Sequence, residues 1–417
     1  MIDKIKKQAK NHKTLIANFS YLSVLEVFVL LTPLITYPYL TRVLGTEIYG
    51  LVITAQILAS YATIVVKFGF DSVSARHISI WREDSSKLSE IMSSIMTMRG
   101  FLWIISFAVY IAIVAVIPIY REHFMLFLFS FGITLNVLLF PQFFFQGIEH
   151  MKYITYINIG IQSLFIALTF ILIKSPEDYL LVPVLHSVGY LLGGLASLYI
   201  IVNKYKVAFK WPTFQQARYY LKDAFPLFAT NAVCTIKDKF SYLLLGAFVS
   251  MGDVVVYDVG SKLTSLAVQP LTIINTVIFP RMAKNQNDDH FVKFGAIIFC
   301  AVMIMVVLIN VFLHPLVHLL IGKDINLIPL RLFLLSPIFL GLGSYIGSSL
   351  IVARGFNKYM FYSIIVTTVS YLTLLSYLYI THALNSVMAF VGLAVFSYLV
   401  EMIYRLCIGF KILKKKI

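Results

Sequence analysis

Apolar stretches of about 20 residues, the length that a helix needs to cross a bilayer, recur along this chain from near Leu15 to Phe410. With 59% hydrophobic and 13% charged residues and a mean hydropathy of +0.86, the chain lies outside the composition of soluble domains. Strands of a membrane β-barrel would be about ten residues long and would alternate in polarity. The sequence therefore predicts an all-α polytopic membrane protein.

One long polar segment, Asn203–Asp223, divides the apolar sequence into two blocks of similar length. We predict an N-terminal six-helix lobe over residues 1–202, a cytoplasmic bridge over 203–223 and a C-terminal six-helix lobe over 224–417, with about twelve spans in all. The predicted spans of the first lobe are Thr14–Leu40, Ile48–Phe70, Ile91–Ile117, Phe124–Phe145, Tyr153–Ile173 and Tyr179–Val202. Those of the second are Ala224–Val249, Val254–Phe279, Phe291–Leu313, Leu327–Val352, Met360–Ile380 and Leu384–Phe410.

Lysine and arginine are distributed unequally between the two sides of these spans. The termini, the bridge and the connections on their side hold most of them, whereas the opposite set comprises Arg42, Arg121, Lys174, Lys323 and Arg331. Because short cytoplasmic loops retain positive charge, we expect both termini and the bridge to be cytoplasmic. The basic N-terminus shows no small-residue cleavage pattern, which predicts a retained first span. The net charge of +15 is dispersed among short connections, which disfavours a nucleic-acid partner.

The bridge combines basic and aromatic side chains. Such a mixture suits a segment that lies at a headgroup surface, and a plain solvated loop explains it equally well. The residues concerned are Lys204, Lys206, Phe209, Lys210, Trp211, Phe214, Arg218, Tyr219, Tyr220 and Lys222.

Signs of catalysis or metal binding are weak. The sequence has no P-loop, GxSxG or HExxH motif, and no connection is large enough for a catalytic domain. Cys234, Cys300 and Cys407 fall in apolar spans without metal-ligand spacing and are expected to be small packing residues. His314 and His318 have i,i+4 spacing but no evident third ligand. We expect neither an enzyme nor a cofactor.

Proline and glycine mark places where helices bend or approach each other. Gly189 with Gly193 and Gly343 with Gly347 have the GxxxG spacing that allows close helix contact. Prolines in or near the spans can break the hydrogen-bond ladder, although proline is also common in ordinary membrane helices. They are Pro33, Pro38, Pro141, Pro183, Pro226, Pro270 and Pro337.

Several charged residues remain inside the spans. A charge at the bilayer centre costs on the order of 3 kcal/mol, so such residues normally face a bundle interior or a watery cavity. Each i,i+4 pair that can meet on one helical face is either a neutralised structural pair or part of a functional site. These pairs are Lys67 with Asp71, Asp258 with Lys262 and Glu401 with Arg405.

Arg99 has no acid within helical reach, and Lys237-Asp238-Lys239 carries surplus positive charge. Both places are therefore candidates for an anion-facing wall. Glu26 is the lone acid of the first span; if buried, it would favour its protonated form and could carry a proton, or it could simply pair with a lysine. For His186, a hydrogen-bonded core histidine is favoured over a titrating one.

Several local strings carry a family resemblance. In the first half they are Asn18–Leu22, Pro38–Gly45 followed by Tyr49-Gly50, and Phe68-Gly69-Phe70; in the second they are Leu245-Gly246, Tyr257 with Lys262-Leu263, and Phe279-Pro280-Arg281. The most specific string is Phe145–Glu149 with Met151-Lys152-Tyr153. Together they resemble the polysaccharide transporter family of the MOP exporter superfamily, and within it the Wzx-type flippases of O-antigen repeat units.

The resemblance implies a MATE/MOP-like protein of the bacterial inner membrane, with two six-helix lobes around a central cationic cavity. Such a protein moves an undecaprenyl-diphosphate-linked oligosaccharide from the cytoplasmic to the periplasmic leaflet, with or without H⁺ or Na⁺ coupling. Its expected partners are the polysaccharide polymerase and chain-length machinery, and it is expected to be a monomer. Other exporters of the superfamily, for drugs or a peptidoglycan-precursor lipid, remain alternatives. A membrane polymerase or ligase is a weaker one, because no large periplasmic loop is present.

Within that framework each charged position receives a predicted role. We expect the cavity cations that bind substrate to be Arg99, Lys237, Lys239, Lys262 and Lys67. We expect ion coupling to involve Glu26, Asp258 or Asp71, whose protonation could bias an alternating-access equilibrium.

Overall fold

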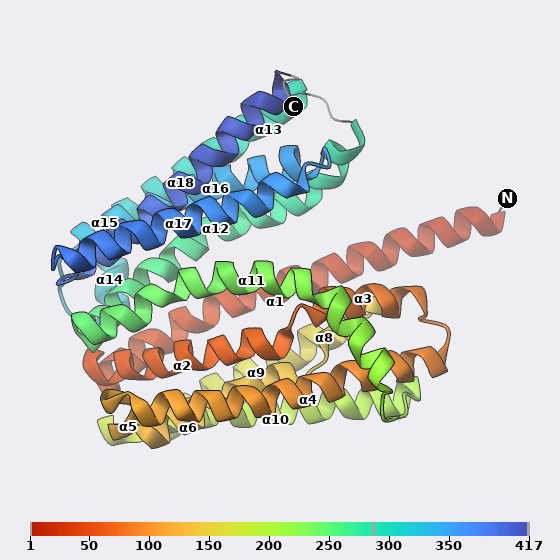
Figure 1. Cartoon of the computed structure of the whole chain (residues 1–417), viewed down its shortest axis with the longest axis horizontal. Coiled ribbons are helices and arrows are strands. Elements are labelled where there is room, and N and C mark those ends of the chain that lie inside the picture. The colour runs from red at the N-terminus through yellow and green to blue at the C-terminus, as the bar shows by residue number, and fades with distance from the viewer. Residues whose placement is uncertain (1, 286–287, 415–417) are drawn as a thin grey trace. The chain divides into compact units, whose positions relative to one another are not determined.

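The computed structural model describes residues 2–285 and 288–414, with side chains described for residues 17–271, 288–289 and 291–414. Every regular element in this part of the chain is a helix, as Figure 1 shows, which confirms the predicted all-α class. The string Phe279-Pro280-Arg281 and the basic residues of the N-terminal segment lie outside the described side chains.

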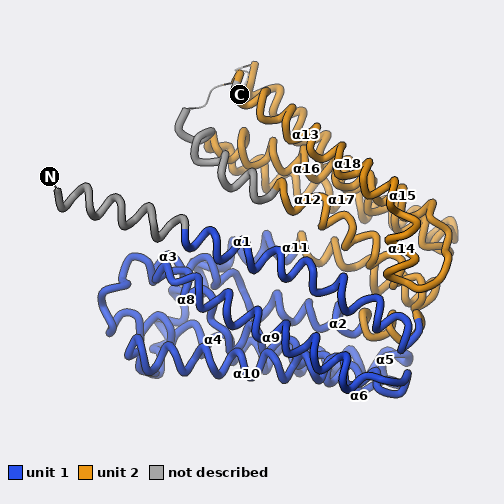
Figure 2. Tube along the Cα trace, turned by 180° about the vertical axis from the view of Figure 1, so that it is seen from behind, with its two compact units in different colours: residues 1–45, 55–232 blue, residues 46–54, 233–417 orange. Residues whose placement is uncertain are grey.

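The chain forms two compact units, which Figure 2 colours separately. Unit 1 comprises residues 1–45 and 55–232, and unit 2 comprises residues 46–54 and 233–417. Unit 1 contains α1 (Ile2–Leu44), most of α2 (Thr46–Lys67), α3 (Phe70–Ile80), α4 (Ser85–Val116), α5 (Pro118–Glu122), α6 (Phe124–Phe131), α7 (Leu135–Leu139), α8 (Gln142–Gly147), α9 (Met151–Leu172), α10 (Leu181–Tyr205) and the first part of α11 (Phe214–Phe248).

Unit 2 contains the start of α2, the end of α11 and all later elements. The chain therefore passes between the units within helices α2 and α11, and the segment 203–223 belongs to unit 1. The later elements are α12 (Met251–Asn285), α13 (Asp288–Val311), α14 (Leu313–Ile321), α15 (Ile328–Phe333), α16 (Ser336–Ile346), a π-helix (Gly347–Val352), α17 (Asn357–Ile380) and α18 (Val387–Leu413).

Ten helical segments of the described residues are long and apolar enough to cross a membrane, and they coincide with ten of the predicted spans. The chain is therefore a multi-pass membrane protein. The two remaining predictions, Ala224–Val249 and Val254–Phe279, fall in α11 and α12, which are helices of 35 residues each. Both carry charged residues in their middle parts, and their crossing of the membrane stays a prediction.

Three predicted spans are interrupted. The span Ile48–Phe70 ends as a helix at Lys67, because Phe68 and Gly69 both adopt left-handed backbone conformations (φ 43° and 73°). The span Phe124–Phe145 breaks at Phe140, which is extended (φ −108°, ψ 90°) because the following Pro141 disfavours a helical conformation there. The span Leu327–Val352 is divided into α15, α16 and the π-helix. By contrast, Pro33, Pro38 and Pro226 lie within continuous helices.

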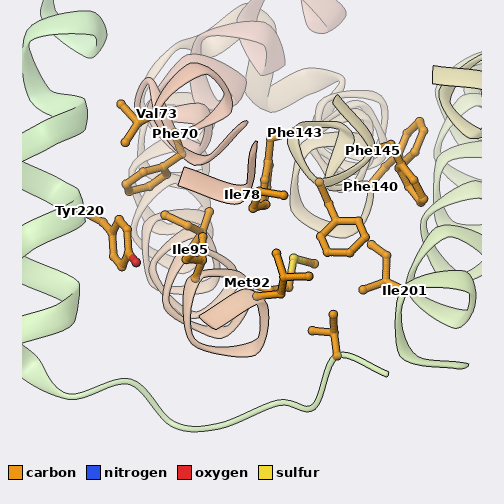
Figure 3. Close-up of a cluster of buried hydrophobic side chains, with 14 of the residues drawn as sticks. Phe70, Val73, Ile78, Met92, Ile95, Phe140, Phe143, Phe145, Ile201 and Tyr220 are labelled. Atoms are coloured by element: carbon orange, nitrogen blue, oxygen red, sulfur yellow. The ribbon is translucent and has the colours of Figure 1, made fainter. Parts of the chain in front are cut away.

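The core of unit 1 is a cluster of buried side chains from α1, α3, α4, α8, α9, α10 and α11, together with Phe140 at the break after α7 (Figure 3). Phe143 and Phe145 of α8 and Phe70 of α3 are fully buried within it. The predicted GxxxG contact is also present, since a Cβ on Gly193 of α10 would lie 2.3 Å from Ile161 of α9. The close approach of α9 and α10 therefore depends on glycine at this position.

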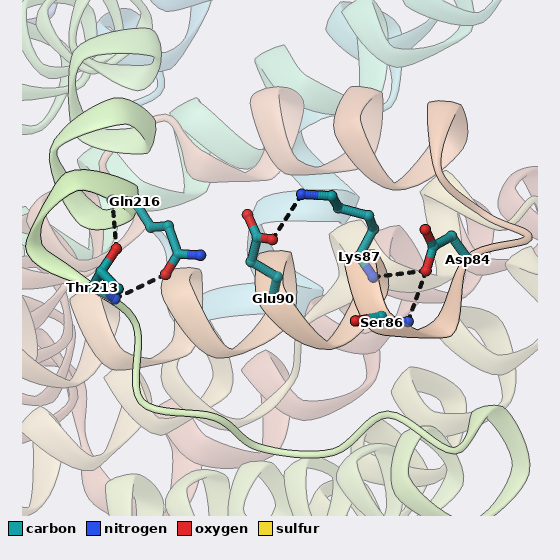
Figure 4. Close-up of polar contacts among 6 residues, drawn as sticks. All are labelled: Asp84, Ser86, Lys87, Glu90, Thr213 and Gln216. Atoms are coloured by element: carbon teal, nitrogen blue, oxygen red, sulfur yellow. Dashed lines mark hydrogen bonds and ion pairs between the residues drawn. The ribbon is translucent and has the colours of Figure 1, made fainter.

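The bridge is an ordered part of unit 1. Residues 206–213 are non-helical and run along α4 (Figure 4), where the backbone N–H groups of Ala208 and Lys210 donate to the hydroxyls of Ser89 and Ser93 (3.0 and 2.9 Å). Thr213 and Gln216 then cap the start of α11. The predicted bridge Asn203–Asp223 therefore continues α10 in its first part, is hydrogen-bonded to α4 in its middle and is helical at its end.

Candidate functional site

In unit 1, the break between α2 and α3 brings three charged residues together. Gly69 lies so close to α11 that a Cβ would be 2.7 Å from the carbonyl oxygen of Ala224. After this turn, Asp71 in the first turn of α3 faces Arg99 of α4, and its Oδ1 accepts a hydrogen bond of 2.5 Å from Arg99 Nη2. The other carboxylate oxygen lies 4.0 Å from Lys67 Nζ. The predicted Lys67–Asp71 pair is present, but Asp71 is bound more closely by Arg99.

Arg99 is 1% exposed, and its guanidinium also donates to the carbonyl oxygen of Val137 (2.9 Å) and lies over the Phe143 ring (4.8 Å). Arg99 therefore has an acidic partner, although none lies within reach on its own helix. The spacing rule missed Asp71 because this acid comes from another helix. Lys67, with a 52% exposed side chain, is the accessible cation of this cluster.

A small cavity of about 40 Å³ adjoins the three charged residues. Asn136 and Gln142, next to the break at Phe140, complete its polar lining. Asn136 Oδ1 and Arg99 Nε are buried and make no hydrogen bond within the described part of the chain. Since buried polar groups usually have partners, this cavity suits a bound water molecule or a small polar group.

In unit 2, α11 contributes Lys237, a buried side chain. Its Nζ lies 3.1 Å from Asp238 Oδ1, donates to Ser397 Oγ of α18 at 3.1 Å and sits 5.2 Å from the centre of the Tyr398 ring. The adjoining cavity of about 10 Å³ is too small for a ligand. Lys237 is therefore held inside the unit, while Lys239 is half-buried and also has a partner.

The α12 pair is arranged differently. Asp258 is buried, forms an ion pair with Lys262 and accepts a hydrogen bond from Tyr242 Oη at 3.2 Å. Lys262 keeps 34% of its side chain exposed. The predicted i,i+4 pair is present, with one buried member and one accessible member.

The third pair, Glu401 with Arg405 in α18, is also present and is mostly buried. Arg405 Nε donates to Ser363 Oγ of α17 at 3.1 Å. Gly347 leaves room for the guanidinium, because a Cβ there would lie 3.4 Å from Arg405 Nη1. These contacts favour a structural role that joins α17 and α18.

Glu26, the predicted proton carrier of the first span, is exposed on α1 and already has an interaction partner. The burial on which that prediction depended is absent. His186 is a core histidine, as favoured: its ring stacks on Phe165 (3.6 Å between centroids) and its Nδ1 lies 3.4 Å from Gln56 Nε2. Among the described residues no cluster of three metal-ligating side chains occurs.

Two polar arrangements escaped the sequence reasoning. Asn18 of α1 holds the start of α9, because its Nδ2 donates to the carbonyl of Glu149 (2.8 Å) and its Oδ1 accepts from Met151 N–H (3.3 Å). Asp223 of α11 accepts from Arg76 Nη2 (2.7 Å) and lies 3.0 Å from His77 Nε2. Both link segments far apart in sequence, so no local pattern could reveal them, although Asn18 and Glu149 fall in the strings that carried the resemblance.

Solved structures with a similar fold are transporters. An inward-facing and an outward-facing structure of a multidrug resistance MATE family transporter of the MOP superfamily each match with a TM-score of 0.65 and 14% identity. The former match covers 92% of this chain and 93% of the other, and the latter covers 95% and 94%. At this identity the likeness establishes the MATE/MOP-like fold.

Two sequence relatives are provisionally named O-antigen transporters. The protein of Escherichia coli (strain K12) is 24% identical over 273 residues, 66% of each chain. That of Shigella dysenteriae is 26% identical over 341 residues, which cover 79% of this chain and 84% of the relative. The family model described as polysaccharide biosynthesis protein matches residues 15–286. As the resemblance predicted, the chain belongs to this polysaccharide biosynthesis protein family.

Proposed function

We propose that the protein is a flippase that moves undecaprenyl-diphosphate-linked oligosaccharide repeat units, of O-antigen or a related surface polysaccharide, from the cytoplasmic to the periplasmic leaflet. Its family, its transporter fold and the provisional names of its relatives support this proposal. Alternating access, in which the cargo site opens to one side of the membrane at a time, is the proposed mode of movement.

The observation that carries the proposal is a surplus of cations in the charged clusters of both units. In unit 1, Lys67 and Arg99 share the single carboxylate of Asp71. In unit 2, the lysines of α11 and α12 outnumber the carboxylates of Asp238 and Asp258. A diphosphate is an anion that such a surplus attracts, and the attraction strengthens where water is scarce. A cationic drug would be repelled.

Exposure divides the cations into two roles. Arg99 and Lys237 are buried and hold neighbouring helices, so they act as positioning residues. Lys67 and Lys262 are partly exposed, and each is a candidate to contact the cargo phosphate in its own unit. This assignment differs from the sequence-based one, which singled out Arg99 and the Lys237-Asp238-Lys239 segment for an anion-facing wall.

Ion coupling is proposed at Asp258. Protonation of its carboxylate would weaken the ion pair with Lys262 and make that cation more available to a phosphate. Proton uptake and cargo binding would then favour each other. Asp71 is the second candidate, since its carboxylate is bound by two cations, Arg99 and Lys67. Glu26 is the weakest of the three because it is exposed.

The test is a leaflet-translocation assay in proteoliposomes with a defined undecaprenyl-diphosphate oligosaccharide. Lys67→Gln and Lys262→Gln should each slow translocation by about tenfold, the loss expected for one charge-assisted contact. Lys210→Gln, an exposed lysine of the bridge, is the matched control and should be silent. Translocation by both test variants at the wild-type rate would remove these lysines from the proposal. Indifference of wild-type translocation to imposed proton and sodium gradients would remove the coupling.

The same liposomes separate the alternatives. Accumulation of a cationic dye without movement of the lipid-linked glycan would indicate a drug exporter, and equal movement of a lipid-linked peptidoglycan precursor would indicate a broader flippase. An elongated glycan product would indicate a polymerase. That reaction is disfavoured because the longest described connection between helices, residues 206–213, leaves no room for an acceptor-binding domain.

We also propose a bacterial inner-membrane location with the bridge and both termini cytoplasmic. The exposed Phe209, Trp211 and Phe214 lie beside the basic residues of the bridge, as expected for a segment at an anionic headgroup surface. A cysteine placed at Lys210 should react with an impermeant maleimide only after the inner membrane is opened. Labelling of intact cells from the periplasmic side would contradict this orientation.

A further inference from the structure

Unit 2 contains an apolar groove of about 230 Å³ that the proposed flippase activity does not use. It lies where α13 begins and α18 ends, with α16 and the π-helix as its floor. Figure 1 shows α13, α16 and α18 side by side in this unit. The first turns of α13 and the last turns of α18 supply its two walls, so the groove belongs to one end of the unit.

Two glycines bring the walls close to the floor. A Cβ on Gly295 of α13 would lie 3.0 Å from the ring of Tyr345, and one on Gly409 of α18 would lie 3.1 Å from Leu350. Val292 on one wall and Phe410 on the other are exposed. The groove is therefore open to the outside of unit 2 between α13 and α18, with a narrow and tightly packed base.

The lining is suited to hydrocarbon and not to water. Tyr345 brings the one side-chain oxygen of the described lining, and its hydroxyl already donates to the carbonyl of Phe291 at 2.7 Å. The rings of Tyr345 and Phe291 stack with 4.9 Å between their centroids. Because an ordered water needs two to four polar partners, water has little to bind here. A water molecule occupies about 30 Å³ in the liquid. The groove therefore has the volume of several water molecules, which is enough for a short length of aliphatic chain.

An exposed lysine continues one wall of the groove. Lys414 directly follows Leu413, which lines the groove, and comes four residues after Phe410, so it continues that wall beyond the end of α18. Lys411 in the last turn of α18 is also exposed, but it follows Phe410 by one residue and therefore lies on another face of the helix. An apolar slot that ends at an exposed lysine matches the chemistry of a lipid with an anionic headgroup.

We propose that this groove binds one acyl chain of an anionic glycerophospholipid, whose phosphate lies at Lys414. The site is separate from the charged clusters of α11 and α12, and its occupancy requires no cargo. The bound lipid would fill the space that Gly295 and Gly409 leave, and would fix the C-terminal turn of α18 at one membrane surface.

Native mass spectrometry of the purified full chain tests the proposal, with phosphatidylglycerol or phosphatidylcholine of identical acyl chains added in detergent. Val292→Trp fills the open side of the groove, and Val307→Trp, an exposed position farther along α13, is its control. Lys414→Gln removes the charge beside the groove, and Lys411→Gln, on another face of the same helix end, is its control. Both replaced lysines are exposed, so these variants should fold.

We expect wild type and both controls to retain phosphatidylglycerol in preference to phosphatidylcholine. Lys414→Gln should lose about fivefold in phosphatidylglycerol affinity, and Val292→Trp should lose both lipids. Unchanged phosphatidylglycerol retention in either test variant would overturn the proposal. Displacement of phosphatidylglycerol by equimolar undecaprenyl phosphate would also overturn it, because the groove would then be a cargo-chain site.

Discussion

The Arg99–Asp71 pair allows a stability measurement to distinguish a positioning residue from a cargo ligand. Arg99 is 1% exposed, and its acidic partner is Asp71 at 2.5 Å. Asp71→Asn removes the negative charge while it preserves the shape of the side chain. The guanidinium would then stay buried with only the Val137 carbonyl and the Phe143 ring as close partners. We therefore expect Asp71→Asn to destabilise unit 1.

The magnitude follows from burial. Removing one partner of a fully buried ion pair costs about 3–5 kcal/mol. The Asp71 side chain is 37% exposed, and asparagine can still accept a hydrogen bond, so we expect about 2–3 kcal/mol. At about 2–4 °C per kcal/mol for a unit of this size, the Tm should fall by about 4–12 °C.

Thermal unfolding of the detergent-solubilised protein provides the assay, and Lys67→Gln provides the control. Lys67 lies 4.0 Å from Asp71 with a half-exposed side chain, so its loss should cost less than about 1 kcal/mol. Combining Asp71→Asn with Arg99→Met removes both charges and should restore much of the lost stability. An unchanged Tm in Asp71→Asn, or equal losses in Asp71→Asn and Lys67→Gln, would refute the view that Arg99 is bound internally.

Three further predictions concern the linkages of unit 1. Gly69→Ala should lower the Tm, because a left-handed backbone (φ 73°) and a contact of 2.7 Å oppose a side chain there. Gly100→Ala in the open middle of α4 should instead increase the free energy of unfolding by about 0.5–1 kcal/mol and so raise the Tm. Asn18→Ala removes two hydrogen bonds to the start of α9 and should lower the free energy of unfolding by about 1–2 kcal/mol. Amide hydrogen exchange at residues 149–153 should accelerate in this variant, and it should stay unchanged in the control variant Asn203→Ala. Burial, with Lys152 and Lys204 nearby, lowers the pKa of His150 below 6.5. Because the folded state then resists protonation of His150, its contribution to stability should be complete above about pH 6.5 and should be lost as the pH falls toward the folded-state pKa. In a profile of Tm against pH, His150→Gln should therefore flatten the decline on the acid side.

Helix geometry explains which features could be predicted from the sequence. The three i,i+4 pairs that spacing predicted are present as ion pairs, because residues four apart on one helix meet whatever the rest of the chain does. Most apolar spans were located for a similar local reason. The GxxxG contact of α10 could also be predicted, since small residues four apart leave a flat face for a neighbouring helix.

Contacts between distant segments could not be predicted. The bridge resembles a free linker by composition, but two serine hydroxyls of α4, more than a hundred positions earlier, hold its backbone. Serines at such positions are common in membrane helices, so nothing in the sequence distinguished Ser89 and Ser93. Asp223, which joins Arg76 and His77, was assigned to the end of that linker for the same reason.

The assignment of cargo-binding residues depends on these distant contacts. Composition gives the surplus of cations, but it does not say which of these side chains stays exposed in the folded protein. The turn at Phe68-Gly69 directs Asp71 toward Arg99, and Ser397 of α18 engages Lys237. Both cations thereby become part of the framework. Lys67 and Lys262 keep accessible ammonium groups although each belongs to a local ion pair. We therefore propose exposure after pairing, and not isolation in the sequence, as the criterion for a phosphate-binding cation in this chain.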